Sequence, residues 1–203
     1  MDPERFEDDA KEPMAQRGQG VLYTRTTDGR PLRNPPTAAE REALLDRCYR
    51  PHHAQLTRRV EEALAAHGRA LIIDGHSFPS RPLPVDLDQS PERPDICIGT
   101  DNFHTPKELI DVFTNTCAAA DWSVAVDRPY AGTLVPSKHY RRDPRVMSMM
   151  VEVNRRLYLV NEPEDVSKSA SWPGTRDAIL ASIHEAVATA RKIMPQTNTE
   201  IGI

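Results

Sequence analysis

The stretch of residues 70–77, Ala-Leu-Ile-Ile-Asp-Gly-His-Ser, constrains the fold of this chain more than any other part of the sequence. Four apolar residues, two of them β-branched, follow a glycine that can end a helix, and they lead directly into a polar tip. This pattern predicts a buried strand. Because ligands of open α/β sheets bind beyond the carboxyl ends of the strands, we expect His76 at the centre of a site. The alternative for a lone histidine is a structural role in capping a loop.

Two later segments repeat this design of an apolar strand followed by polar residues. Apolar strands are predicted at 96–98 and 122–126, with a helix at 105–120 between them. Strand, helix and strand in this order imply parallel pairing with a right-handed crossover. Three strand ends therefore carry polar clusters, which are Asp74/His76/Ser77, Asp101/His104 and Asp127/Tyr130/Thr133.

The residue patterns in the last third of the chain predict one more strand and one more helix. The strand at 146–155 has Ser148, Met150, Glu152 and Asn154 on one face, because side chains alternate along a strand. The amphipathic helix covers residues 174–194.

The first third of the chain predicts irregular structure followed by helix. Residues 1–36 indicate irregular chain with one short strand or hairpin. Thr37 and Glu40 form a capping box that begins a helical run, which Pro51 divides or kinks before Gly68. His53 follows this break, where it could serve as a substrate contact.

Composition bounds the class of protein. The 203 residues predict a single domain over 1–203, and a net charge of -4 gives no reason to expect a nucleic-acid partner. No stretch is long and apolar enough for a bilayer, and the first residues do not resemble a signal peptide, so we expect no membrane contact and a cytoplasmic location. Three widely spaced cysteines, in largely apolar surroundings, predict reduced core thiols: Cys48, Cys97 and Cys117.

The polar residues permit a hydrolytic zinc site, which needs about three ligands, a water and a carboxylate base. His76 could be a ligand, Glu152 the base, and Arg155 the group that binds a substrate carboxylate. A catalytic triad on Ser77 is open as well, but the nucleophile-elbow sequence is absent. The alternative for Glu152 and Arg155 is a plain surface ion pair.

Four segments in this order resemble the N-formylglutamate amidohydrolase family. They are Asp-Gly-His-Ser at 74–77, Pro-Asp-Ile-Cys-Ile-Gly-Thr at 94–100, Pro-Tyr-Ala-Gly-Thr at 129–133 and Val-Glu-Val-Asn-Arg-Arg-Leu-Tyr at 151–158. The segment Tyr-Arg-Pro-His-His-Ala-Gln-Leu at 49–56 is similar to the one that precedes the family's metal strand. The resemblance implies an α/β fold, a three-layer α/β/α sandwich around a mixed sheet, as in zinc-dependent exopeptidases and aspartoacylases. It also implies hydrolysis of N-formyl-L-glutamate, or a related N-acyl amino acid, to glutamate and formate in histidine degradation.

The resemblance also implies roles for individual residues. His76 and Asp2 would be Zn2+ ligands, and Glu152 would be the general base. We add His104 as a hypothetical third ligand. The small-molecule carboxylate substrate would be bound by Arg155, Asn154, Tyr130, Thr133, Ser77 and His53.

Family members have a strand and a Pro-His-Ser-Gly metal motif ahead of the aspartate that matches Asp2, whereas here Met1 precedes it directly. We therefore expect either a start codon set too late or a shortened member that lacks one strand and one ligand. A sheet edge left open in this way favours a homodimer. Two alternatives to the enzyme stay open. One is a catalytically silent relative that binds an acidic small molecule or a partner subunit, and the other is an α/β domain in which His76 and Glu152 are structural.

Overall fold

The computed structural model describes residues 1–162 and 164–193, which fall into two compact units. The first unit comprises Met1–Arg59 and Arg81–Pro91, and the second comprises Val60–Ser80 and the chain from Glu92 onward. Each unit is described by itself, and the single domain expected over 1–203 stays a prediction. Within the described residues, no helix combines the length and the apolar character of a membrane span.

A four-stranded mixed sheet forms the centre of the second unit. Its strands lie in the order β1 (Ala70–Phe78), β4 (Val146–Asn154), β2 (Ile96–Gly99) and β3 (Val124–Val126). β1 and β4 are parallel, as are β2 and β3, whereas β2 and β4 are antiparallel. The predicted α/β class with a mixed sheet is confirmed, as is the parallel pairing across the predicted strand–helix–strand unit.

Strand β1 is longer than the sequence pattern predicts. Its backbone stays paired with β4 through His76 and Ser77 up to Phe78, so the predicted polar tip belongs to the strand and not to a loop. The hydrogen bonds of the parallel ladder explain this difference, since they are independent of side-chain polarity. The polar side chains of residues 74–77 are therefore held on a rigid element.

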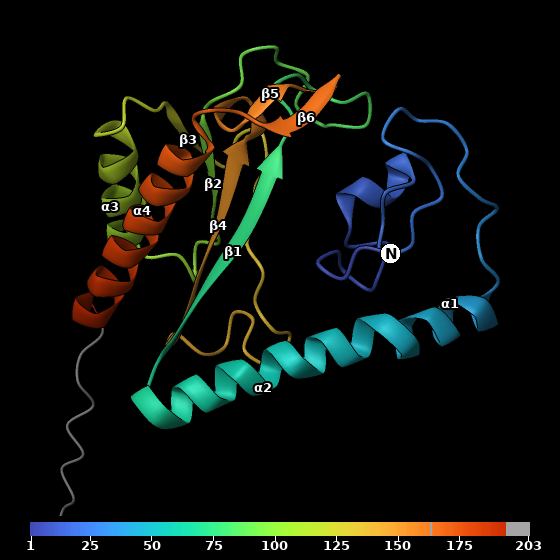
Figure 1. Ribbon diagram of the computed structural model, residues 1–203. Coiled ribbons are helices and arrows are strands. Elements are labelled where there is room, and N and C mark those ends of the chain that lie inside the picture. Colours follow the sequence, from blue (N-terminus) through green and yellow to red (C-terminus); the bar gives the residue numbers. More distant parts are fainter. Residues whose placement is uncertain (163, 194–203) are drawn as a thin grey trace, which may run out of the picture. The chain divides into compact units, whose positions relative to one another are not determined.

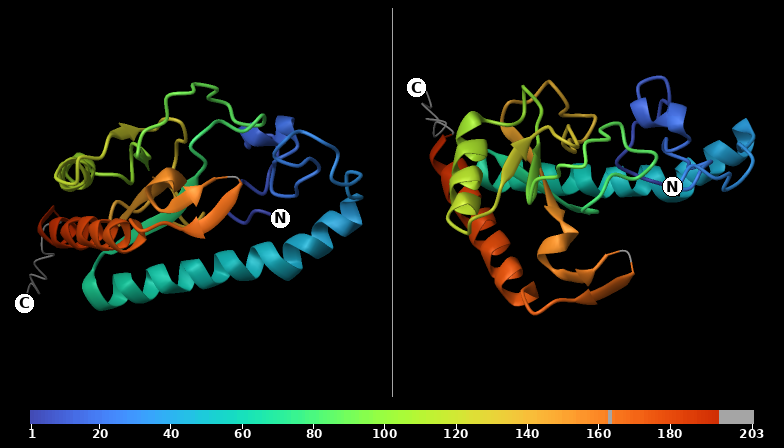
Figure 2. Two further views of the ribbon diagram at one scale, coloured as in Figure 1. Left: turned by 45° about the horizontal axis from the view of Figure 1, so that its top comes forward. Right: turned by 90° about the horizontal axis from the view of Figure 1, so that it is seen from above.

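Helices α3 (Lys107–Ala118) and α4 (Trp172–Ile193) pack against each other beside the sheet (Figures 1 and 2). The main core lies between these helices and one face of the sheet. The sheet contributes Ile96, Ile98, Met147, Met149 and Val151, and the helices contribute Leu109, Phe113, Cys117, Ala186 and Ala190. The predicted final helix is confirmed, although its expected last residue, Met194, lies outside the described residues.

The opposite face of the sheet bears a smaller apolar cluster near the start of β1 and β4. It comprises Val60, Ala70, Val135 and Val146. After β4, a short 3-10 turn, Arg155–Leu157, leads to a two-stranded antiparallel sheet of β5 (Leu159–Asn161) and β6 (Asp165–Lys168). Figure 1 shows this small sheet near the carboxyl ends of β1 and β4.

The first unit contains α1 (Ala38–Leu44), a π-helical turn (Leu45–Tyr49) and the start of α2 (Arg50–His67). The predicted capping box of Thr37 and Glu40 is confirmed. Pro51 does not split the run into two helices, because the wider π-helical turn directly before it relieves the clash of the proline ring with a preceding carbonyl. The N–H of Arg50 bonds to the carbonyl of Leu45, five residues back.

The N-terminal segment is irregular, as predicted, but it is anchored. Val21 and Leu22 pack with Leu45 and Tyr49 in a small core, and one isolated bridge joins Arg25 to Pro31. Cys97 and Cys117 are buried free thiols, as expected. The prediction for Cys48 is wrong: it is exposed, because the helix at this point turns its neighbour Tyr49 and not Cys48 toward the core.

Candidate functional site

His76 and Glu152 are direct neighbours across the pairing of β1 and β4, and Cys97 of β2 is the neighbour of Glu152 on its other side. Residues in register share a face of a sheet, so these three side chains lie on the face opposite the main core. Glu152 is buried, with 8% of its surface exposed. Burial, with a smaller contribution from the negative charge of Glu152, raises the pKa of the Cys97 thiol to about 11.

Asp74 joins His76 on this face because the two residues are separated by one position of the same strand. Nε2 of His76 lies 2.9 Å from Oδ1 of Asp74, so the imidazole N–H donates to the carboxylate. This contact orients the ring and leaves the lone pair on Nδ1, which is the arrangement seen in many metal-binding histidines. Asp74 was missed as a functional residue, although its i, i+2 spacing from His76 was the available signal.

The loop that contains Tyr130 and Thr133 packs onto the same face. The Sγ of Cys97 donates to the carbonyl of Tyr130 at 3.2 Å. A close approach of this loop requires Gly99, since a Cβ there would lie 2.2 Å from the carbonyl oxygen of Gly132. The structure thus brings Tyr130 onto the face that carries Glu152.

The two predicted substrate contacts in this loop have different surroundings. The Tyr130 ring packs edge-on against Phe78, with 5.7 Å between ring centroids, and the Arg93 guanidinium lies above it at 5.6 Å. The Thr133 hydroxyl is hydrogen-bonded to the hydroxyl of Ser148 at 2.6 Å. Thr133 therefore lies beside the first half of β4, because its partner Ser148 precedes Glu152 by four positions in that strand.

Arg155 lies at the carboxyl end of β1 and is held by Ser77. Its Nε donates to Oγ of Ser77 at 3.2 Å, and its Nη2 donates to the Ser77 carbonyl at 3.3 Å. Nη1 donates to Oε1 of Glu162 at 2.8 Å. Burial alone would lower the pKa of Arg155, but the hydrogen bond and the charge of Glu162, together with Tyr158, outweigh it and raise that pKa. Ser77 thus positions a cation, and its side chain lies on the face opposite His76.

Asn154 is completely buried, and its amide joins neighbouring segments of the chain. Nδ2 donates to the carbonyl of Pro94 at 2.8 Å, and Oδ1 accepts from the N–H of Arg156 at 3.1 Å. These contacts give Asn154 a structural role beside the expected substrate site.

His104 does not lie with His76. It is 1% exposed, its Nδ1 donates to the carbonyl of Val146, and its Nε2 accepts from the N–H of Arg141, both at 2.7 Å. Val146 begins β4 and is six residues from Glu152, which corresponds to about 20 Å along a strand. Because metal ligands lie about 2 Å from their ion, His104 and His76 cannot share one. The antiparallel direction of β2 causes this separation, since it carries the chain after β2 toward the start of β4.

Asp2 and His53 belong to the first unit. The Asp2 carboxylate accepts hydrogen bonds from the Tyr23 hydroxyl at 2.8 Å and from Nε of Arg5 at 3.2 Å. Burial, followed by the hydrogen bond to Asp2, raises the pKa of Tyr23 to about 12. Nε2 of His53 donates to the carbonyl of Pro3 at 2.6 Å, and burial lowers the pKa of His53.

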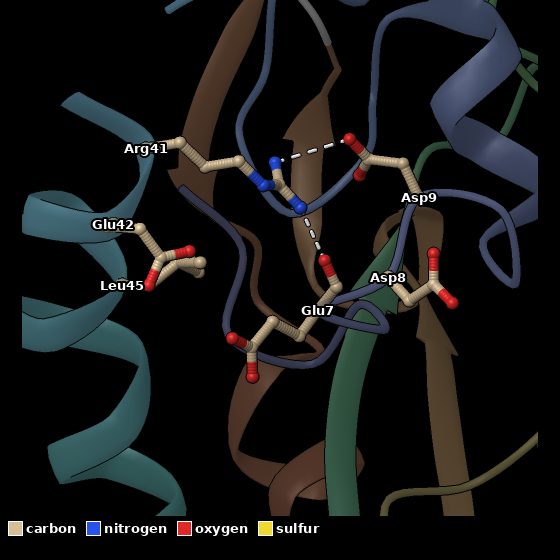
Figure 3. A pocket seen from close by; sticks show the side chains of 6 residues that line it. All are labelled: Glu7, Asp8, Asp9, Arg41, Glu42 and Leu45. Carbon is tan, nitrogen blue, oxygen red and sulfur yellow. Dashed lines mark hydrogen bonds and ion pairs between the residues drawn. The ribbon is translucent and has the colours of Figure 1, made fainter. Parts of the chain in front are cut away.

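The first unit also contains an open acidic hollow of about 540 Å³. Figure 3 shows Arg41 extending from α1 toward Asp9 and the backbone of Glu7, with an ion pair of 3.2 Å to Asp9. The hollow is lined by Glu7, Asp8, Asp9, Arg41, Glu42 and Leu45, none of which the sequence predicts as a site residue.

The donor atoms beside Glu152 suit a divalent metal ion. An imidazole nitrogen and carboxylate oxygens are the ligand types that zinc prefers in hydrolytic sites, and the Asp74 carboxylate fixes the tautomer of His76 that would bind it. This face therefore supplies an imidazole and a carboxylate of the types that zinc takes, which are two of the about three protein ligands of such a site.

The fold and this polar sheet face define an α/β protein with an imidazole and a buried carboxylate on adjacent strands of a mixed sheet. The chain belongs to the N-formylglutamate amidohydrolase family, because the sequence model of that family matches residues 1–159. The predicted family resemblance is thus confirmed.

Solved structures support the same fold. An N-formylglutamate amidohydrolase from Ralstonia eutropha superimposes with a TM-score of 0.76 and 24% identity, over 95% of this chain and 75% of that one. A gene product of Agrobacterium tumefaciens superimposes with a TM-score of 0.55 and 17% identity, over 77% of this chain and 57% of that one. Among curated protein sequences no match is found.

Proposed function

We propose that this protein hydrolyses the formyl amide of N-formyl-L-glutamate, or a closely related N-acyl amino acid, in a zinc-dependent reaction. The observation that carries the proposal is the pairing of His76 with Glu152 on one face of the sheet. A histidine ligand and a buried carboxylate base on neighbouring strands are two of the groups that metal-assisted amide hydrolysis needs.

His76, oriented by Asp74, would bind the zinc ion. A bound zinc ion supplies a Lewis acid that polarises the formyl carbonyl and lowers the pKa of a water molecule. Glu152 accepts a proton from the attacking water and returns it to the leaving amine, so that glutamate and formate are released. Arg155, which Ser77 holds at the carboxyl end of β1, would bind a carboxylate of the substrate there.

The test measures formate release from N-formyl-L-glutamate and zinc content on the full chain. We expect about one zinc ion per chain, formate release with zinc, and loss of both in His76→Ala. His184→Ala is the matched control, because His184 is exposed on α4. Zinc uptake that is unchanged in His76→Ala, or no formate release by the zinc-loaded protein, would contradict the proposal.

Binding without catalysis is a second candidate function. It rests on Arg155, whose side chain is 36% exposed and held in place by Ser77. Such a cation can bind the carboxylate of an acidic small molecule without catalysing a reaction. Glutamate binding by a protein that releases no formate would favour this candidate.

A further inference from the structure

An internal carboxylate already occupies the cation that the proposed function uses for its substrate. Nη1 of Arg155 donates to Oε1 of Glu162 at 2.8 Å, and the Glu162 side chain is only 9% exposed. Its other oxygen, Oε2, accepts from the N–H of Ser80 at 3.3 Å. Both oxygens of Glu162 are therefore engaged, one by a charged donor and one by the backbone after β1.

This pair is better organised than a typical surface ion pair. Exposed pairs contribute little because two long side chains must be ordered and water screens their charges. Here Ser77 fixes the guanidinium from its Nε and Nη2 side, and Ser80 fixes the carboxylate. Three N–H groups of Arg155 are used by Ser77 and Glu162, of the five that a guanidinium offers.

The side chain of Glu162 ends in the same group as the substrate of the proposed function. A glutamate side chain and the distal arm of N-formyl-L-glutamate both present a carboxylate on two methylene groups. A ligand carboxylate that approaches Arg155 therefore meets a guanidinium whose charge is already balanced.

We propose that Glu162 is an intrinsic competitor for Arg155 and sets the affinity of the site for carboxylate ligands. It holds Arg155 in the free protein, and a dicarboxylate ligand takes its place on the guanidinium when it binds. This inference rests on the proposed role of Arg155 in substrate binding. Each ligand must replace the ion pair between Arg155 and Glu162. Anions that contact Arg155 alone therefore bind weakly, whereas dicarboxylates that gain a second contact bind more tightly.

Calorimetric titration with glutarate tests the affinity, because glutarate is a dicarboxylate without a scissile amide. We expect Glu162→Gln to bind glutarate about fivefold more tightly than the unaltered chain. The matched control is Glu164→Gln, which removes the same charge from an exposed position just before β6. The control is expected to change the affinity less than about twofold.

Amide hydrogen exchange gives a second readout on the unaltered chain. The N–H of Ser80 is bonded to Glu162 in the free protein, so its exchange should accelerate when glutarate displaces Glu162 from Arg155. This measurement does not depend on how well the Glu162→Gln variant folds. A Ser80 amide whose protection is unchanged at saturating glutarate would overturn the inference.

The remaining outcomes separate this inference from the proposed function. Glutarate binding that is equal or weaker in Glu162→Gln overturns the inference even where formate release is observed, because Glu162 would then position Arg155. Failure of every variant to bind glutarate overturns it as well. Tighter glutarate binding by Glu162→Gln in a protein that releases no formate supports the inference and contradicts only the amidohydrolase reaction.

Discussion

His76 of β1 and Glu152 of β4 occupy paired positions in a parallel strand pair, so their side chains leave the same face of the sheet. Both residues lie on regular strands, which hold functional side chains more rigidly than loops do. The N-formylglutamate amidohydrolase family to which the chain belongs thus has, in this member, an imidazole and a carboxylate on adjacent strands.

Glu152→Gln should abolish turnover while the fold and the zinc content persist. If Glu152 is the general base, its amide cannot accept the proton of water, and the rate of formate release should fall by about 10²–10⁴-fold. Glu185→Gln, at an exposed position of α4, controls for the loss of one negative charge. A rate within tenfold of the unaltered protein would show that Glu152 is not the base.

Removal of His104 should affect stability and not metal binding. His104→Ala leaves the carbonyl of Val146 and the N–H of Arg141 without their buried partner, at a cost of about 2–4 kcal/mol in the free energy of unfolding. Urea denaturation measures this loss, and elemental analysis measures zinc. Zinc loss in His104→Ala, at a protein concentration and temperature where it stays folded, would contradict the separation of His104 from His76.

Gly99→Ala should destabilise the sheet and the loop that covers it. A new Cβ would lie 2.2 Å from the carbonyl oxygen of Gly132, and the strain of such overpacking is about 1–3 kcal/mol. Gly75→Ala is the matched control, because it lies in the same sheet and no described atom comes within 4 Å of the position that its new Cβ would take. Equal melting temperatures of the two variants would contradict this packing.

Thiol reactivity should distinguish Cys48 from the two buried cysteines. Burial raises the pKa of both Cys97 and Cys117 to about 11, so both thiols stay protonated and unreactive at pH 8. Their reactivity should rise only as the pH approaches about 11. Titration of the native protein with a chromogenic disulfide should therefore modify Cys48 alone, which is exposed. Cys48→Ser should remove the fast phase, and a fast phase that persists in this variant would be inconsistent with buried Cys97 and Cys117.

Local sequence patterns were sufficient for many parts of the fold. The capping box of Thr37 and Glu40, the parallel pairing of β2 with β3, and the shared face of Glu152 and Asn154 follow from spacing and from side-chain periodicity. The ordered motifs around His76 and Glu152 were likewise enough to predict the family.

Only the tertiary structure decided which polar clusters meet. Strand direction depends on hydrogen bonds between segments far apart in the sequence, and the antiparallel fit of β2 to β4 sends His104 to the opposite end of the sheet from His76. The contact of Arg155 with Glu162 depends equally on how the chain after β4 folds back. A sequence pattern records which face a side chain takes along its own strand, whereas the neighbours across that face are chosen by packing and long-range pairing.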